Sequence, residues 1–120
     1  MTEIGIKLRK KSFEFALRIV KLARFLETDK KDWVLSRQIL KSGTSIGANV
    51  REGQEGQSRA DFVSKLGIAL KESNETLYWL DLLHDTEYID TDQYGSLIAD
   101  CIELKRMLTS IIKTARENGL

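Results

Sequence analysis

Proline is absent from the sequence, and no apolar run approaches the ~18 residues that a membrane-spanning helix needs. Because proline is the commonest helix breaker, its absence, together with many Leu, Ile, Ala, Lys and Glu residues, favours an all-α fold. The opening segment MTEIGIKLRK also lacks the apolar core of a signal peptide. We therefore expect one cytoplasmic domain that spans residues 1–120 and has no membrane partner.

Cysteine and histidine are nearly as scarce. Cys101 is the only cysteine, which excludes an internal disulfide and a cysteine-based zinc cluster. His84 is the only histidine; Asp81 precedes it with the carboxylate-x-x-His spacing of di-iron bundles, but such a centre needs a second histidine from another helix. One histidine also cannot activate Ser42, Ser45 and Cys101 as nucleophiles. We expect no metal, no cofactor and no catalytic residue.

The formal net charge of +1 conceals two halves of opposite sign. Residues 1–60 carry 13 Lys and Arg against 7 Asp and Glu, a balance of +6, whereas residues 61–120 carry 6 against 11, a balance of −5. The two halves therefore attract each other, either inside one subunit or between subunits.

The segment from Leu8 to Leu26 is predicted to be a helix with apolar residues on two faces. A helix in a monomeric four-helix bundle needs only one apolar face, so this helix has more apolar surface than its own chain can bury. The first set is Phe13, Ala16, Leu17, Val20 and Ala23, and the second is Phe15, Ile19, Leu22, Phe25 and Leu26.

A second helix is predicted to start near Lys30, with Asp29 as its cap, and to run through the segment SGTSIGANVREG. Its apolar positions recur every three or four residues, which is the spacing of one face of a helix and is not expected of a loop. Gly43 and Gly47 each destabilise a helix by about 1 kcal/mol relative to alanine, so we expect another backbone to approach closely there. The segment lacks the lysine of a phosphate-binding P-loop.

A polar stripe follows the same helix, formed by Ser42, Ser45, Asn49 and Glu52 at spacings of three, four and three. Polar groups beside a core seam usually form hydrogen bonds that fix helix register or a subunit contact, which is the interpretation that we favour. A ligand site is the alternative.

Two further helices are predicted. One runs from Arg59 to about His84 with a Ser58 cap, and the other follows an Asp90 cap and a Gln93 capping box to the terminator Asn118-Gly119. The four helices are joined by short connections, which predicts an antiparallel up-down-up-down four-helix bundle.

Basic residues form two groups, Lys7, Arg9, Lys10 and Lys11, and then Lys30, Lys31, Arg37 and Lys41. Such residues are usually solvated, but they can also contact nucleic-acid phosphates, and an oligomer would repeat each weak contact. An antiparallel pair of the first two helices would bring the first group toward Lys41, so we expect the groups partly to merge. No aromatic-interleaved motif indicates sequence-specific RNA recognition.

The chain resembles the four-helix bundle proteins encoded within intervening sequences of 23S ribosomal RNA genes. The resemblance covers nearly the whole chain and is carried by SGTSIGANVREG, QSRADFVSKLGIALKESNETLYWLDLL and the closing amphipathic helix. Its most specific part is the pattern Ser45, Ile46, Asn49, Val50, Glu52 and Gly53, followed by Ser58, Asp61, Phe62, Glu72 and Glu75. Arg51 stands where many members have alanine.

The resemblance implies a homopentamer of antiparallel bundles and supplies no catalytic residue. Similar proteins include the accessory variability determinant of diversity-generating retroelements, a basic pentamer that binds nucleic acid and a reverse transcriptase; this chain is much less basic, so that role is not carried over. We expect a non-enzymatic protein associated with RNA or DNA through the eight basic residues above, or alternatively a protein-binding scaffold. The residues expected at a helix seam or subunit contact are Ser42, Gly43, Ser45, Gly47, Asn49 and Glu52.

Overall fold

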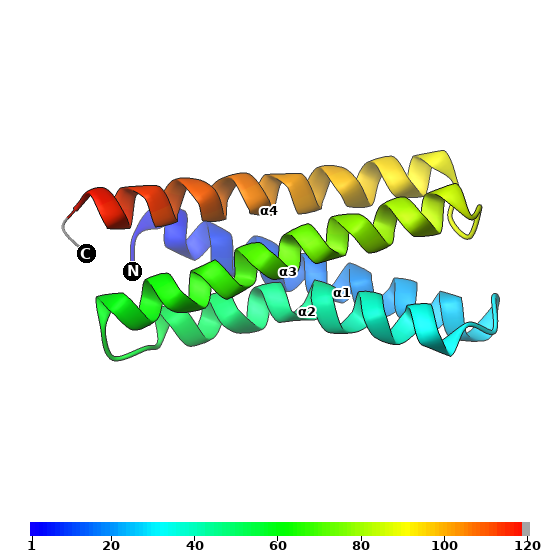
Figure 1. Ribbon diagram of the computed structural model, residues 1–120, viewed down its shortest axis with the longest axis horizontal. Coiled ribbons are helices and arrows are strands. Elements are labelled where there is room, and N and C mark those ends of the chain that lie inside the picture. Colours follow the sequence, from blue (N-terminus) through cyan, green and yellow to red (C-terminus); the bar gives the residue numbers. More distant parts are fainter. Residues whose placement is uncertain (119–120) are drawn as a thin grey trace.

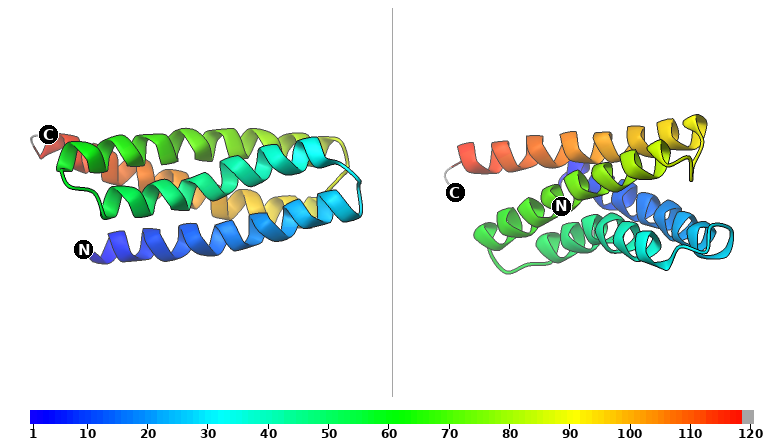
Figure 2. Two further views of the ribbon diagram at one scale, coloured as in Figure 1. Left: turned by 90° about the horizontal axis from the view of Figure 1, so that it is seen from below. Right: turned by 45° about the vertical axis from the view of Figure 1, so that its right-hand side comes forward.

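The structure is a computed structural model that describes residues 1–118. Its four helices are α1 (Glu3–Thr28), α2 (Trp33–Gln54), α3 (Arg59–Asp85) and α4 (Thr91–Glu117). They run antiparallel along one long axis, and the start of α1 lies at the same end as the last turn of α4 (Figure 1). Two further views show the same order of helices in a bundle of 48 × 22 × 20 Å (Figure 2). The predicted all-α up-down-up-down bundle is therefore confirmed.

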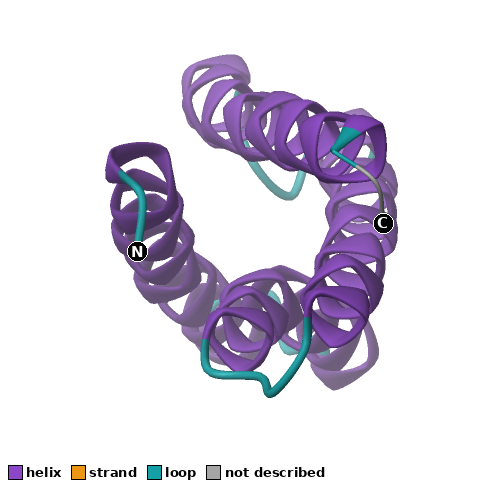
Figure 3. Cartoon of the chain, turned by 90° about the vertical axis from the view of Figure 1, so that its left-hand side faces the viewer, coloured by secondary structure: helices purple, strands orange, loops and turns teal. Residues whose placement is uncertain are grey.

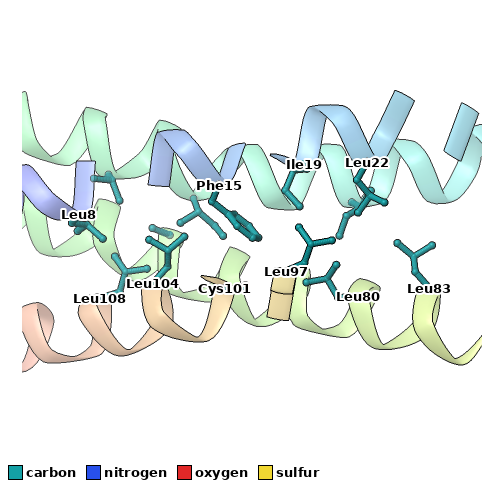
Figure 4. Close-up of a cluster of buried hydrophobic side chains, with 14 of the residues drawn as sticks. Leu8, Phe15, Ile19, Leu22, Leu80, Leu83, Leu97, Cys101, Leu104 and Leu108 are labelled. Atoms are coloured by element: carbon teal, nitrogen blue, oxygen red, sulfur yellow. The ribbon is translucent and has the colours of Figure 1, made fainter. Parts of the chain in front are cut away.

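The core lies between the helices and is made of aliphatic side chains at helical spacing. In α1 the second apolar set faces inward: Phe15, Ile19 and Leu26 are almost completely buried. Figure 4 shows the α1 side chains Phe15 and Ile19 pointing toward those of α3 and α4. The apolar positions of α4 that repeat every three or four residues are buried at Leu97, Cys101, Leu104, Leu108 and Ala115, and half-buried at Tyr94 and Ile111.

The four helices do not enclose the core equally on all sides. In the view along the axis, α1, α2, α3 and α4 form an open arc whose two ends are α1 and α4 (Figure 3). Of the four pairs of neighbouring helices, these two have the smallest contact. Charged side chains bridge them: the Lys11 ammonium lies 2.9 Å from Glu103, and the Arg18 guanidinium lies 2.6 Å from Asp100. Because these ion pairs are partly exposed, water and salt weaken them, and they stabilise the bundle less than the packing of its core does.

The caps expected at the starts of α3 and α4 are confirmed, and the one expected at α2 is not; Gly119 of the expected terminator lies outside the described residues. Ser58 and Asp90 cap α3 and α4, and the Asp90 capping box with Gln93 is present. The predicted Asp29 cap of α2 is wrong. Asp32 is the cap, and its carboxylate accepts a hydrogen bond from Leu35 N at 2.9 Å.

The turn between α1 and α2 explains this difference. The backbone N–H of Asp29 still donates to the carbonyl oxygen of Phe25, so Asp29 closes α1. Lys31 then adopts a left-handed conformation with φ of 56°, and this reverses the chain before Asp32. The first helix also begins earlier than predicted, at Glu3, because Thr2 accepts a hydrogen bond from Gly5 N.

Among residues 1–118, no helix is long and apolar enough to cross a membrane.

The two aspartates of this turn give a direct test of its geometry. Asp32→Ala removes the cap of α2 and the acceptor of the Tyr88 hydroxyl at 3.2 Å, so we expect the free energy of unfolding to fall by about 1 to 2 kcal/mol. Asp29→Ala is the matched control and should change it by less than about 0.5 kcal/mol. Urea denaturation measures both, and equal losses would contradict the assignment of Asp32 as the cap.

Candidate interaction surfaces

The two central glycines of α2 face α1. A Cβ atom built on Gly43 would lie 2.7 Å from Ile19 Cγ1, and one on Gly47 would lie 3.1 Å from the carbonyl oxygen of Ser12. A separation of 2.7 Å is closer than non-bonded carbon atoms approach in proteins. These two glycines therefore allow α1 and α2 to pack closely along their middle turns.

The polar stripe lies on the α3 side of α2, and its members do not share one role. The buried Ser42 hydroxyl accepts a hydrogen bond from the Thr76 hydroxyl of α3 at 3.0 Å. The exposed Glu52 carboxylate lies 3.8 Å from the Lys65 ammonium of α3. These two residues join α2 to α3.

The other two members of the stripe bond within α2. Ser45 donates to the carbonyl oxygen of Lys41, and the Asn49 amide donates to the carbonyl oxygen of Ser45 at 2.8 Å. Both residues are half-buried. The expected network between helices is thus formed by only part of the stripe.

Two glutamates of α3 lie beside this stripe. Burial, followed by the negative charge of Glu75, raises the pKa of the Glu72 carboxyl. The positive charges of Lys71 and Lys41 oppose that rise. The Trp79 indole N–H donates weakly to Glu75 at 3.4 Å. Two carboxylates and two ammonium groups therefore lie near one another here.

The structure separates the two basic groups instead of merging them. The first group lies beside the end of α2, where Arg9 pairs with Glu55 at 3.2 Å and the Gln54 amide donates to the carbonyl oxygen of Gly5. Lys30 and Lys31 lie in the turn at the opposite end. The expectation failed because Lys41 lies near the middle of α2, two residues before the Gly43 contact with α1.

Six of the eight basic residues remain exposed and have no ion pair within residues 1–118. They are Lys7, Lys10, Lys30, Lys31, Arg37 and Lys41. The other two, Arg9 and Lys11, are half-buried and pair with Glu55 and Glu103.

A surface that the sequence indicated only indirectly lies along the outside of α1. Ile6 is 57% exposed, Phe13 51% and Leu17 50%, although all three are large apolar residues. We call Ile6, Phe13 and Leu17 the α1 face. The two apolar sets of the first helix predicted that some apolar surface would stay exposed. The spacing of these residues did not predict which set would face outward.

The α1 face borders a groove of about 430 Å³ between α1 and α2. Its floor includes the small residues Gly47 and Ala48, and the Arg51 guanidinium lies over the Phe13 ring at 5.6 Å from the ring centre. Arg51 was absent from the predicted contact residues because it is isolated from both basic groups in the sequence.

The residues considered above for metal binding or catalysis take part in packing and hydrogen bonds within the described part of the chain. The Tyr94 hydroxyl donates to Asp81 at 2.6 Å, and the Tyr94 ring stacks on His84 with 4.3 Å between centres. Residues 1–118 contain no group of three or more His, Cys, Asp or Glu side chains placed to hold a metal ion. Burial raises the pKa of the Cys101 thiol to about 12, so the reactive thiolate is scarce at neutral pH.

These features define a small antiparallel helical bundle whose distinctive residues pack helices together or occupy its outer faces. The chain belongs to the family described as 23S rRNA-intervening sequence proteins, whose family model matches residues 5–110. It is also similar to a crystallised protein of unknown function from the S23 ribosomal protein family of Bacteroides thetaiotaomicron. The two are 56% identical, with a TM-score of 0.90 over 92% of this chain and 98% of that one. No curated protein matches the chain.

The close approach of α1 and α2 predicts opposite effects of alanine at two glycines. Gly43→Ala should lower the free energy of unfolding by about 1 to 3 kcal/mol, because its methyl group would overlap Ile19. Gly95→Ala in α4, where a Cβ atom meets nothing within 4 Å, should raise it by up to about 1 kcal/mol. Thermal and urea unfolding measure both changes. A neutral Gly43→Ala would contradict the tight seam.

The buried Cys101 thiol should be protected from alkylation. At pH 8 iodoacetamide should modify the folded protein far more slowly than the protein in urea, because few thiolates exist below a pKa of about 12 and the side chain is inaccessible. Mass spectrometry over time measures the two rates. Equal rates would show that the core opens readily around α4.

Proposed function

We propose that the protein is a non-enzymatic homopentamer that associates with RNA through its exposed lysines and arginines. The observation that carries the RNA part is the set of six basic residues that are exposed and unpaired within residues 1–118. A cation that is already neutralised by a neighbouring carboxylate offers less to a phosphate than one that is free. The family description, which refers to an intervening sequence of 23S rRNA, supports RNA as the first ligand to test.

Self-association is supported by the α1 face. Three large side chains, each at least half exposed, follow one side of α1. Contiguous apolar surface of this kind is typical of a protein interface. Assembly would bury it and would repeat the weak basic groups around the oligomer, which raises the total affinity for a polyanion.

A protein-binding scaffold is the second candidate, and the same α1 face favours it. Apolar contacts are nearly insensitive to salt, whereas binding through phosphates releases counterions and weakens steeply as salt rises. The salt dependence of binding therefore separates the two functions.

The RNA proposal predicts that the logarithm of affinity for a single-stranded 23S rRNA fragment falls linearly with the logarithm of salt concentration. Lys30→Glu with Lys31→Glu should make that slope shallower by about 0.7 for each phosphate that the variant no longer neutralises. Fluorescence anisotropy in a salt series measures it. These two residues suit the test because they are exposed and lie in the turn between α1 and α2. The Lys30 ammonium also lies 5.8 Å from the centres of the Phe25 and Tyr88 rings, so circular dichroism is needed to check that the variant remains folded.

Arg106→Glu is the matched control, since Arg106 is exposed on α4 and lies outside both basic groups. It should leave the slope almost unchanged. RNA binding that is undetectable in dilute salt would contradict the RNA proposal, and light scattering of the same samples tests the pentamer separately.

A further inference from the structure

We propose that single-stranded RNA binds along the outer side of α2, with an unpaired base stacked on the Trp33 indole and with Arg37 and Lys41 contacting phosphates. This inference rests on the RNA association proposed above, and it names the form of RNA and the side chain that recognises it. We call Trp33, Arg37 and Lys41 the α2 stripe.

Trp33 is a large aromatic side chain that the packing of its own chain leaves half uncovered. It is the first residue of α2 and is 50% exposed. The other tryptophan of the sequence, Trp79, is half-buried and packs against the hydrophobic core. Trp33 does not join that core within residues 1–118. Half of the surface of a flat aromatic ring is therefore available to a partner.

The two cations of the α2 stripe follow Trp33 at intervals of four residues. Four residues of an α-helix make one turn plus about 40°, so the three side chains lie within an arc of about 80° and over about 12 Å of the helix. The buried residues Ile39 and Val50 lie on the opposite side of α2. Arg37 and Lys41 are both exposed, and neither forms an ion pair within residues 1–118. The stripe therefore places an aromatic ring and two cations side by side on the outer surface.

Two lysines extend the positive charge beyond the start of α2. Lys30 and Lys31 are exposed in the turn that leads into the helix. The acidic residues of this segment are Asp29, which is exposed, and Asp32, whose carboxylate is half-buried and caps α2. Residues 29–41 thus carry four Lys and Arg against two Asp, and one of these carboxylates is already hydrogen-bonded. This balance favours a polyanion.

Other carboxylates limit where a strand can lie. Lys41 is close enough to Glu72 of α3 to oppose the rise in the pKa of that carboxyl, so part of its charge is compensated. Exposed Asp85, Glu87 and Asp90 lie at the same end of the bundle as the start of α2, in and beside the turn between α3 and α4 (Figure 1). These groups repel phosphates. We therefore expect the strand to follow the outer side of α2 and not to cross the end of the bundle.

The exposed ring indicates a single strand and not a duplex. In a duplex the faces of each base are covered by neighbouring base pairs, whereas the bases of a single strand are free to stack on an aromatic side chain. Stacking of this kind accepts any base, which agrees with the lack of a sequence-specific recognition motif in this chain. Basic residues alone would bind either form, so Trp33 is the residue that distinguishes the two.

Removing the ring tests the stacking. Trp33→Ala should bind a single-stranded RNA of about 12 nucleotides about 5- to 150-fold more weakly than the unchanged chain, which is the loss expected for one stacked base. Its affinity for the duplex of the same strand with its complement should be unchanged. The salt slope should also be unchanged, because the indole is uncharged. Trp33→Phe should retain part of the affinity, since it keeps a ring. Fluorescence anisotropy in a salt series measures all of these values.

Arg37→Ala should give the opposite pattern. It should weaken binding of the single strand and of the duplex, and it should make the slope for the single strand shallower by about 0.7, because one phosphate is no longer neutralised. Val34→Ala is the matched control: Val34 is 71% exposed and follows Trp33 directly, but it lies about 100° around the helix. This variant should change neither the affinity nor the slope. Circular dichroism and light scattering check that every variant keeps its fold and mass.

Tryptophan fluorescence gives a second measurement that leaves Trp33 in place. Trp79→Phe makes Trp33 the single tryptophan of the chain. Single-stranded RNA should then quench the emission of Trp33, and the duplex should leave it nearly unchanged. If Trp33→Ala does not fold, this measurement decides, and emission that single-stranded RNA does not change would overturn the proposal.

The outcomes separate this inference from the proposed RNA association. If the unchanged chain binds neither the strand nor the duplex in dilute salt, the RNA association itself fails. If it binds RNA and Trp33→Ala leaves the affinity for the strand unchanged, or weakens the strand and the duplex equally, only the stacking on Trp33 is overturned. An unchanged affinity is also the result expected if the exposed ring serves a protein partner instead of RNA.

Discussion

The contact between α1 and α2 determines how the rest of this molecule is arranged. At Gly43 and Gly47 the two helices lie so close that a single methyl group would overlap Ile19 or press on the backbone of Ser12. With this pair fixed, Phe15 and Ile19 turn into the core while Phe13 and Leu17 remain outside. The glycines therefore help to determine which large apolar residues of α1 stay outside the core. Their unfavourable effect on helix stability is offset by this close packing.

The opposite side of the bundle is held differently. Between α1 and α4 the helices are farther apart, and long side chains span the distance: Arg18 reaches both Asp100 and Ser96, and Lys11 reaches Glu103. Exposed ion pairs are weaker and more sensitive to salt than close packing. The same chain thus combines one tightly packed seam with one looser seam.

Much of the fold follows from patterns that the sequence displays directly. The caps of α3 and α4 are single well-placed residues, so these were predicted correctly. The cap of α2 was not, because Asp29 and Asp32 are both suitable cap residues and only the left-handed Lys31 decides between them. Turn geometry of this kind depends on the packing of both flanking helices.

The candidate surfaces were harder to predict. The spacing of residues along a helix shows which side chains share a face, but it does not show which groups of other helices they contact. It placed Ser42 and Ser45 on one stripe, yet Ser42 bonds to α3 and Ser45 bonds to its own helix. It also left open which apolar set of α1 would be buried. Arg51 was overlooked because its partner, the Phe13 ring, is remote in the sequence.

The order in which the helices pack has a consequence for how the chain folds. Each helix packs chiefly on the one that precedes it, from α1 and α2 through to α3 and α4, and the contact between the first and last helices is the smallest. Most contacts are therefore local in the sequence, a topology associated with rapid folding. During translation α1 and α2 are synthesised before α4, so the contacts of the glycine seam are the first contacts between helices that the growing chain can make.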